Sequence, residues 1–166
     1  MIKLDPLDIK ILQALQSEGR MTKVKLAETV GLSVSPCWER LRRLERQGVI
    51  SRYRAEIDLA KIVKAATVWV EISLKRHHQE DFEAFERAVL AQPEIVECWA
   101  TGGTIDYLMR VIASDLDAYQ VLMERLLASD IGIDRYVTCV VTKAVKRPGT
   151  LPIAAILGED RPPGDR

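Results

Sequence analysis

The sequence predicts an α+β protein with two domains, an N-terminal winged helix-turn-helix and a C-terminal ferredoxin-like domain. Residues 1–60 contain apolar residues at helical spacing between capping residues and glycines, whereas residues 61–146 contain runs in which apolar and polar residues alternate as in strands. Residues 147–166 form a tail rich in Pro and Gly. In this tail we expect the segment LPIAAIL to dock on a neighbour and the part from Gly158 to be disordered.

The chain begins with two predicted helices. Asp5 is a suitable N-cap and Pro6 a suitable first residue for a helix that ends near Gly19, with Asp8 close to its positive end. Thr22 caps a shorter second helix. The predicted buried side of this second helix consists of Val24, Ala27 and Val30.

A tight turn and a third helix follow. Gly31 can adopt the left-handed conformation that the turn requires, Ser33 can cap the third helix, and Gly48 ends it. The predicted inward face of the third helix carries Val34, Cys37, Leu41 and Leu44. The next segment, VISRYRAEI, alternates like a strand and predicts the wing.

Positive charge gathers on the outward face of the third helix and on the wing. Residues 33–54 hold six arginines and two glutamates, although the whole chain is neutral. Arginines that pair with Glu39 and Glu45 would form only a solvated surface. The order of turn, helix and basic segment instead favours contact with double-stranded DNA, in which the helix enters the major groove. Candidate base or groove contacts are Ser35, Pro36 and Glu39, and candidate phosphate or groove contacts are Arg40, Arg42, Arg43, Arg52 and Arg54.

The second domain has the predicted order β-α-β-β-α-β. Strands are expected at 66–75, 95–102, 105–113 and 133–146, and helices at 80–93 and 115–129, the latter capped by Ser114. Two such halves form a four-stranded antiparallel sheet with both helices on one face. We expect a partner subunit to cover the other face, and a homodimer would match a two-fold operator.

One hairpin in this domain combines glycines with a carboxylate. Gly102 and Gly103 are ordinarily turn residues. Asp106, however, lies one residue into a mostly apolar strand, where a carboxylate needs a partner or a ligand. Glycine N–H groups beside a carboxylate could hold the two charged groups of a free amino acid.

Several functional classes find no support in the sequence. Cys37, Cys98 and Cys139 form no CxxC pair and are expected to be small buried hydrophobes. His77 and His78 are adjacent, in an expected loop, without a third metal ligand at suitable spacing. The sequence lacks a nucleophile–base arrangement and a phosphate loop, so we expect neither enzymatic activity nor a cofactor. Without a membrane-spanning run or a signal-peptide pattern, we expect a cytoplasmic protein.

Three stretches together resemble the Lrp/AsnC family of transcriptional regulators. They are LDPLDIKILQALQSEGRMTKVKLAETVGLSVSPCWERLRRLERQGVI, GGTIDYLMRV and TCVVTKAVK, which lie in this order over about residues 4–146. The motifs SPCWERLRRLE, DYLMRV and GTLPI are most similar to the branch with cysteine-responsive and branched-chain-catabolism regulators. The resemblance implies a bacterial or archaeal DNA-binding regulator whose dimers assemble further, often into octamers of four dimers.

The resemblance also implies an amino-acid effector pocket between dimers. Transferred residue by residue, this pocket falls on Thr101, Gly103, Asp106 and Thr138, with Tyr107 and Val140 as further candidates. Many family members have an acidic or polar residue followed by an aromatic residue before the aspartate, whereas this chain has Thr104 and Ile105. The departure leaves two hypotheses open, an amino-acid-responsive regulator and an architectural DNA-binding protein without an effector.

Overall fold

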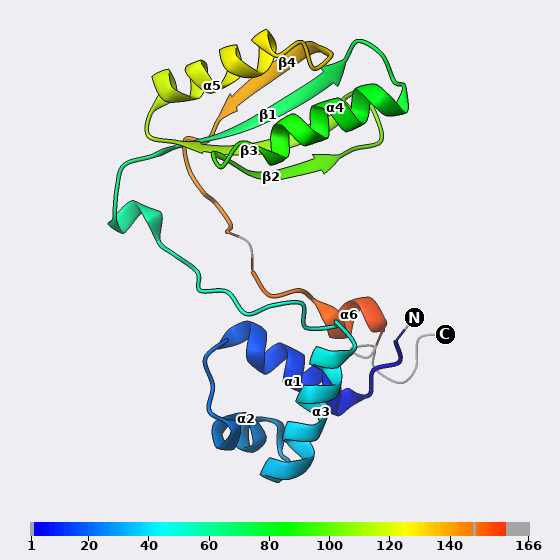
Figure 1. Cartoon of the computed structure of the whole chain (residues 1–166). Coiled ribbons are helices and arrows are strands. Elements are labelled where there is room, and N and C mark those ends of the chain that lie inside the picture. Colours follow the sequence, from blue (N-terminus) through cyan, green and yellow to red (C-terminus); the bar gives the residue numbers. More distant parts are fainter. Residues whose placement is uncertain (1, 148, 159–166) are drawn as a thin grey trace. The chain divides into compact units, whose positions relative to one another are not determined.

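The computed structural model describes residues 2–147 and 149–158, which form two compact units (Figure 1). The first unit includes the chain up to Ile57 and the residues from Lys146 onward, and the second unit is Asp58–Val145. The predicted tail therefore belongs to the same unit as the N-terminal helices. No helix in the described ranges is both long and apolar enough to cross a membrane.

The first unit is built on three helices, α1 (Pro6–Ser17), α2 (Lys23–Val30) and α3 (Val34–Arg46). Gly31 ends α2 in the left-handed conformation, with φ of 76°, and thereby allows the tight turn into α3. The core between the helices includes Ile11, Leu12, Leu26, Ala27, Val30, Cys37, Leu41 and Leu44. These helices and their order confirm the predicted helix-turn-helix.

Two valines expected in this core are exposed. Val24 is 53% exposed because Leu26, Ala27 and Val30 form the side of α2 that packs inward. Val34 is 41% exposed, since it lies in the first turn of α3, where the helix has not yet reached the core. The predicted inward stripes were therefore wrong at the first apolar residue of each helix.

The predicted wing strand is also wrong. None of residues 47–65 belongs to a strand; Val49 and Ile50 pack against the first core, and residues 51–57 run as exposed, irregular backbone. A strand needs a partner for its backbone hydrogen bonds, and the described part of the chain offers none here. Tyr53 fastens the segment to α3 instead, because its hydroxyl donates a hydrogen bond of 2.8 Å to Glu45 Oε1.

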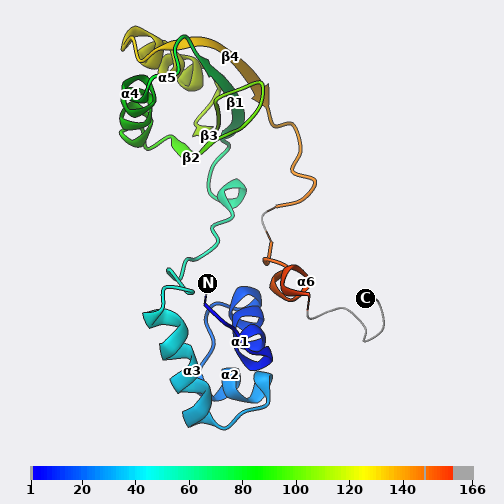
Figure 2. The same cartoon turned by 90° about the vertical axis from the view of Figure 1, so that its right-hand side faces the viewer.

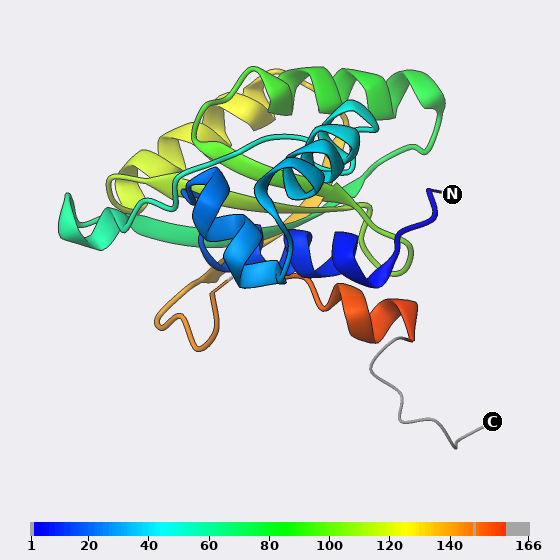
Figure 3. The ribbon, with the colours of Figure 1, turned by 90° about the horizontal axis from the view of Figure 1, so that it is seen from below.

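The C-terminal segment packs on α1 of its own chain. It forms a short helix, α6 (Ile153–Leu157), which lies beside α1 (Figure 3). Ala154 is buried, Ile153 packs against the first core, and Leu151 N–H donates to Gln16 Oε1 at 2.6 Å. The expected disorder beyond Gly158 concerns residues that lie outside the described ranges.

The second unit has the predicted β-α-β-β-α-β order. After a short turn of helix, η1 (Leu59–Lys61), its elements are β1 (Ala66–Leu74), α4 (Gln79–Leu90), β2 (Ile95–Ala100), β3 (Tyr107–Ala113), α5 (Leu116–Ala128) and β4 (Ile133–Val140). The strands form one antiparallel sheet in the order β2-β3-β1-β4. Both α4 and α5 lie on the same face of this sheet (Figure 2).

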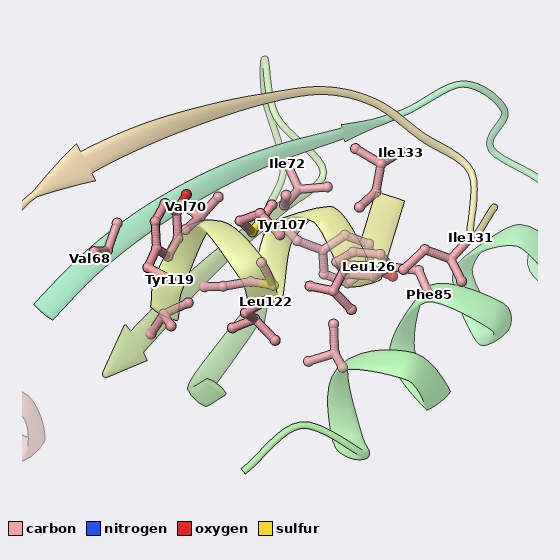
Figure 4. Packing of buried hydrophobic residues seen from close by; sticks show 14 of the residues in the cluster. Val68, Val70, Ile72, Phe85, Tyr107, Tyr119, Leu122, Leu126, Ile131 and Ile133 are labelled. Carbon is pink, nitrogen blue, oxygen red and sulfur yellow. The ribbon is translucent and has the colours of Figure 1, made fainter. Parts of the chain in front are cut away.

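The second core fills the space between the sheet and these two helices (Figure 4). Phe85 of α4 is fully buried, and its ring centre lies 4.5 Å from that of Tyr107 on β3. The N-cap of α5 is Asp115, whose carboxylate accepts a hydrogen bond of 2.7 Å from Ala118 N–H. The prediction of Ser114 as the cap was wrong by one residue, because the longer carboxylate at position 115 reaches the free N–H group.

No helix of the second unit covers the other face of the sheet, which we call the open face. Its apolar residues include Trp69, Trp99, Leu108, Ile112 and Val137, which alternate along their strands with buried positions such as Val70 and Met109. Trp99 and Val137 are exposed, and Trp69 and Leu108 are half-buried. The open face also carries an ion pair of 2.7 Å between Arg110 and Glu97.

The cysteines differ from one another in burial. Cys37 is buried in the first core, Cys98 is partly buried, and Cys139 is exposed on the open face. The expectation that all three are buried was therefore wrong for Cys139, which lies on an edge strand opposite Trp69.

Candidate DNA interface and effector site

The outward face of α3 presents four of the predicted DNA contacts to solvent. Ser35 and Pro36 lie in its first turn, and Glu39 and Arg42 follow at helical spacing. Arg52 and Arg54 are exposed in the segment after the helix. The first turns of such a helix suit base edges, and the arginines suit phosphates.

Arg42 and Lys23 both make cation–π contacts with the ring of Trp38. The guanidinium carbon of Arg42 lies 5.5 Å from the centre of the Trp38 ring, and Lys23 Nζ lies 3.5 Å from it. Trp38 itself packs partly against the first core. The ring attracts both cations and thereby restricts where the Arg42 side chain points.

Arg40 and Arg43 have partners within the chain. Arg40 Nη1 donates to Asp5 Oδ2 at 2.5 Å and to Asp8 Oδ1 at 2.9 Å, while Arg43 Nη2 donates to Asp8 Oδ2 at 2.5 Å. The hydrogen bond from Arg40, together with that from the Asp8 backbone N–H, holds the pKa of Asp5 below its ordinary value. The sequence identified Asp5 as an N-cap and Asp8 as a residue near the positive end of the helix, but gave no sign of these partners.

The turn between β2 and β3 holds three of the four predicted effector residues. Thr101 N–H donates to the backbone oxygen of Asp106 at 2.8 Å, and the Thr101 hydroxyl donates to that of Ile105 at 2.7 Å. Gly103 has φ of 142°, a conformation that favours glycine. These contacts close the turn. Its exposed residues, 101–104, shortly precede Asp106 in the sequence.

Asp106 already has partners on both carboxylate oxygens. Oδ2 accepts a hydrogen bond of 2.7 Å from Leu74 N–H, and Oδ1 lies 3.0 Å from His77 Nε2. Its side chain is 21% exposed, so one edge still meets solvent. The expected need of this carboxylate for a partner is thus met by the end of β1 and by the loop before α4. His77 was not predicted as this partner, because the sequence places it 29 positions from Asp106 and suggested only a metal-ligand role for it.

Thr138 lies apart from the turn within one chain. It sits on β4 opposite Val70, and its hydroxyl shares a hydrogen bond of 2.6 Å with that of Tyr119. Because β1 lies between β3 and β4, the axes of these two strands are separated by about 10 Å. A single chain therefore does not bring Thr138 together with the turn.

The two further candidates differ from each other. Tyr107 is buried and donates a hydrogen bond of 2.8 Å to Glu86, so its hydroxyl serves the second core. Val140, at the end of β4, is exposed. Within the described ranges, no three His, Cys, Asp or Glu residues are grouped so that they could hold a metal ion.

Two family models match the two units. A winged helix-turn-helix DNA-binding model matches residues 4–51, and the Lrp/AsnC ligand-binding domain matches residues 67–151. The chain belongs to the Lrp/AsnC family. As a member of this family it is a DNA-binding transcriptional regulator with an amino-acid-binding domain.

Relatives of this Lrp/AsnC protein agree over most of their length. The transcriptional regulatory protein DoeX of Halomonas elongata is 53% identical over 147 residues, which cover 89% of this chain and 93% of DoeX. The leucine-responsive regulatory protein of Escherichia coli is 41% identical over 150 residues, with coverage of 90% and 92%. A Neisseria meningitidis transcriptional regulator, solved as its L-Met complex, is 34% identical with a TM-score of 0.86, and coverage is 93% of this chain and 99% of that one.

Proposed function

We propose that α3 reads the major groove of operator DNA through Ser35, Pro36, Glu39 and Arg42, and that Arg52 and Arg54 follow the phosphate backbone. The observation that carries this proposal is the separation of the two faces of α3. Cys37, Leu41 and Leu44 are buried, whereas all four proposed reading residues are exposed.

Salt-dependent DNA binding tests this proposal. A duplex is first selected from a random-sequence library by the wild-type protein, and its affinity is then measured over a series of salt concentrations. Arg42→Ala should weaken binding and lower the slope of log affinity against log salt by about one. Arg87→Ala, on α4 of the other unit, is the matched control and should change neither. An Arg42→Ala protein with the wild-type affinity and slope would exclude this face of α3.

We further propose that the effector is a free amino acid bound between protomers. The turn with Thr101, Gly103 and Asp106 would come from one protomer, and Thr138 from a neighbour. The separation of Thr138 from the turn in one chain supports a shared site, and the Neisseria relative solved with L-Met supports an amino-acid effector. The glycine-containing turn would hold the effector carboxylate, and Asp106 would attract its ammonium group.

A thermal-shift screen of the twenty amino acids tests the effector proposal. A ligand at one hundred times its dissociation constant stabilises the native state by about 2.7 kcal/mol, which raises the melting temperature by several degrees. Thr138→Val removes a hydroxyl while keeping the shape and should reduce the shift. It also removes the bond to Tyr119, so each variant is compared with its own unliganded melting temperature.

An architectural DNA-binding protein without an effector is the second candidate function. It is favoured by one observation, the engagement of both Asp106 oxygens by Leu74 and His77. A carboxylate held in this way already has what a buried charge requires. Absence of a thermal shift with every amino acid at millimolar concentration would favour this second function.

We also propose that the protein forms a homodimer through the open face, and that four dimers assemble into an octamer. The exposed apolar residues of that face support the dimer, because a face without a helix exposes Trp99 and Val137 to water. Sedimentation velocity over a dilution series measures both levels of assembly. A monomer at every concentration would contradict the proposal.

A further inference from the structure

Asp5, the N-cap of α1, and Asp8, in its first turn, form an ionic cluster with two arginines of α3. Asp8 is only 1% exposed and is the one buried charged residue among those described. Its Oδ1 accepts from Arg40, and its Oδ2 accepts from Arg43 and from the backbone N–H of Asp5. Asp5 in turn accepts from Arg40 and from the Asp8 N–H. We call these four side chains the α1–α3 clamp.

The clamp treats its two arginines unequally. Arg40 bonds to both carboxylates through a single nitrogen, and its side chain is 26% exposed. Arg43 bonds only to Asp8, and its side chain is 42% exposed, so it meets solvent more than Arg40 does. Arg42, which lies between them in the chain, takes no part in the clamp and is exposed. Arg40 therefore bonds to two carboxylates of the clamp, Arg43 to one and Arg42 to none.

The energetic cost of releasing Arg40 decides its role. A DNA phosphate at Arg40 would approach two carboxylates that already neutralise this guanidinium, one of which has almost no contact with water. Removing one partner from such a buried pair is strongly unfavourable, because the remaining charge stays desolvated. Arg40 is consequently expected to remain bonded to Asp8 while the protein binds DNA. Because it then neutralises no phosphate, it should release no counterion from the DNA.

We propose that Asp5 and Asp8 are positioning residues that lock the recognition helix α3 onto α1, and that Arg40 belongs to this lock rather than to the DNA contacts. Arg43 serves both purposes, because it bonds to a single carboxylate and is the more exposed of the two arginines. The clamp thus removes one arginine from the DNA-facing charge and uses it to hold the orientation of α3. The proposal rests on the proposed placement of α3 in the groove.

A comparison of three single variants tests the clamp, with DNA affinity measured over a salt series and melting measured without DNA. Arg40→Ala should lower the melting temperature by about 10 °C or more and leave the salt slope unchanged. Arg42→Ala should lower the slope by about one and leave the melting temperature unchanged. Arg43→Ala should lower both. Melting measured across the same salt series shows where the folded fraction is constant, and over that range the slope reports only the number of phosphate contacts.

A second variant covers the case in which Arg40→Ala does not fold. Arg40→Gln retains hydrogen-bond donors toward Asp5 and Asp8 but carries no charge, so it should fold and keep the wild-type salt slope. A slope lowered by about one in either Arg40 variant would overturn the proposal, and so would an unchanged melting temperature in Arg40→Ala. If Arg42→Ala also leaves the salt slope unchanged, the proposed placement of α3 in the DNA groove is wrong. The melting temperatures then still test the clamp.

Discussion

Trp99 offers a direct test of the proposed dimer. It lies on β2 opposite Leu108, at the edge of the open face, and is 61% exposed in the single chain. A buried tryptophan covers up to about 250 Å², so roughly 150 Å² of Trp99 remains available to a partner. At about 25 cal/mol per Å² this area corresponds to about 4 kcal/mol for each copy, as an upper estimate.

A two-fold interface contains the residue twice, so Trp99→Ala removes two such contributions. If one third of the estimate is realised, the dimer loses about 2.7 kcal/mol, which corresponds to a roughly 100-fold higher dissociation constant. Sedimentation velocity over a dilution series measures this constant. Leu90→Ala, which changes an exposed leucine at the end of α4, is the control and should leave it unchanged. Equal dissociation of Trp99→Ala and wild type would refute the assignment of the open face.

Three further predictions concern stability, each measured by urea unfolding. Phe85→Ala should cost about 3–5 kcal/mol, because a fully buried ring packed on Tyr107 leaves a cavity, and a loss under 1 kcal/mol would contradict that packing. Thr22→Ala should cost about 1 kcal/mol by removing the cap on Lys25 N–H, while Thr22→Ser should restore most of it. Arg40 holds the pKa of Asp5 below its ordinary value, so the carboxylate stabilises the native state above about pH 4 and loses this effect as the pH falls further. The difference in unfolding free energy between wild type and Asp5→Asn should therefore shrink from pH 6 to pH 3. A difference that stays constant over this range would argue against the ion pair.

Much of the fold could be predicted because local patterns specify it. The alternation of β1 and the helical spacing in α1, α4 and α5 follow directly from which positions a backbone turns inward. The left-handed Gly31 and the caps Asp5 and Thr22 mark boundaries for local reasons as well. The wing could not be predicted in this way, because alternation alone does not provide a partner strand.

The candidate site likewise contains features set by local pattern and features that depend on residues distant in the sequence. Exposure of Ser35, Pro36, Glu39 and Arg42 followed from the helical period once Leu41 and Leu44 were placed in the core. The engagement of Asp106 by His77 did not follow, because the two residues are 29 positions apart in the chain. The engagement of Arg40 and Arg43 by Asp5 and Asp8 did not follow either, because these residues are also more than 30 positions apart.

The amino-acid order alone established the sequence of helices and strands, the turn at Gly31 and the division into a basic N-terminal part and a sheet-containing part. Those features depend on periodicity and on backbone preferences that act within a few residues. The tertiary structure decided which charges remain free, since Arg40 meets Asp5 across 35 positions and only folding brings α3 against α1. Its charge serves the clamp because a buried carboxylate, Asp8, must be neutralised where water cannot reach it.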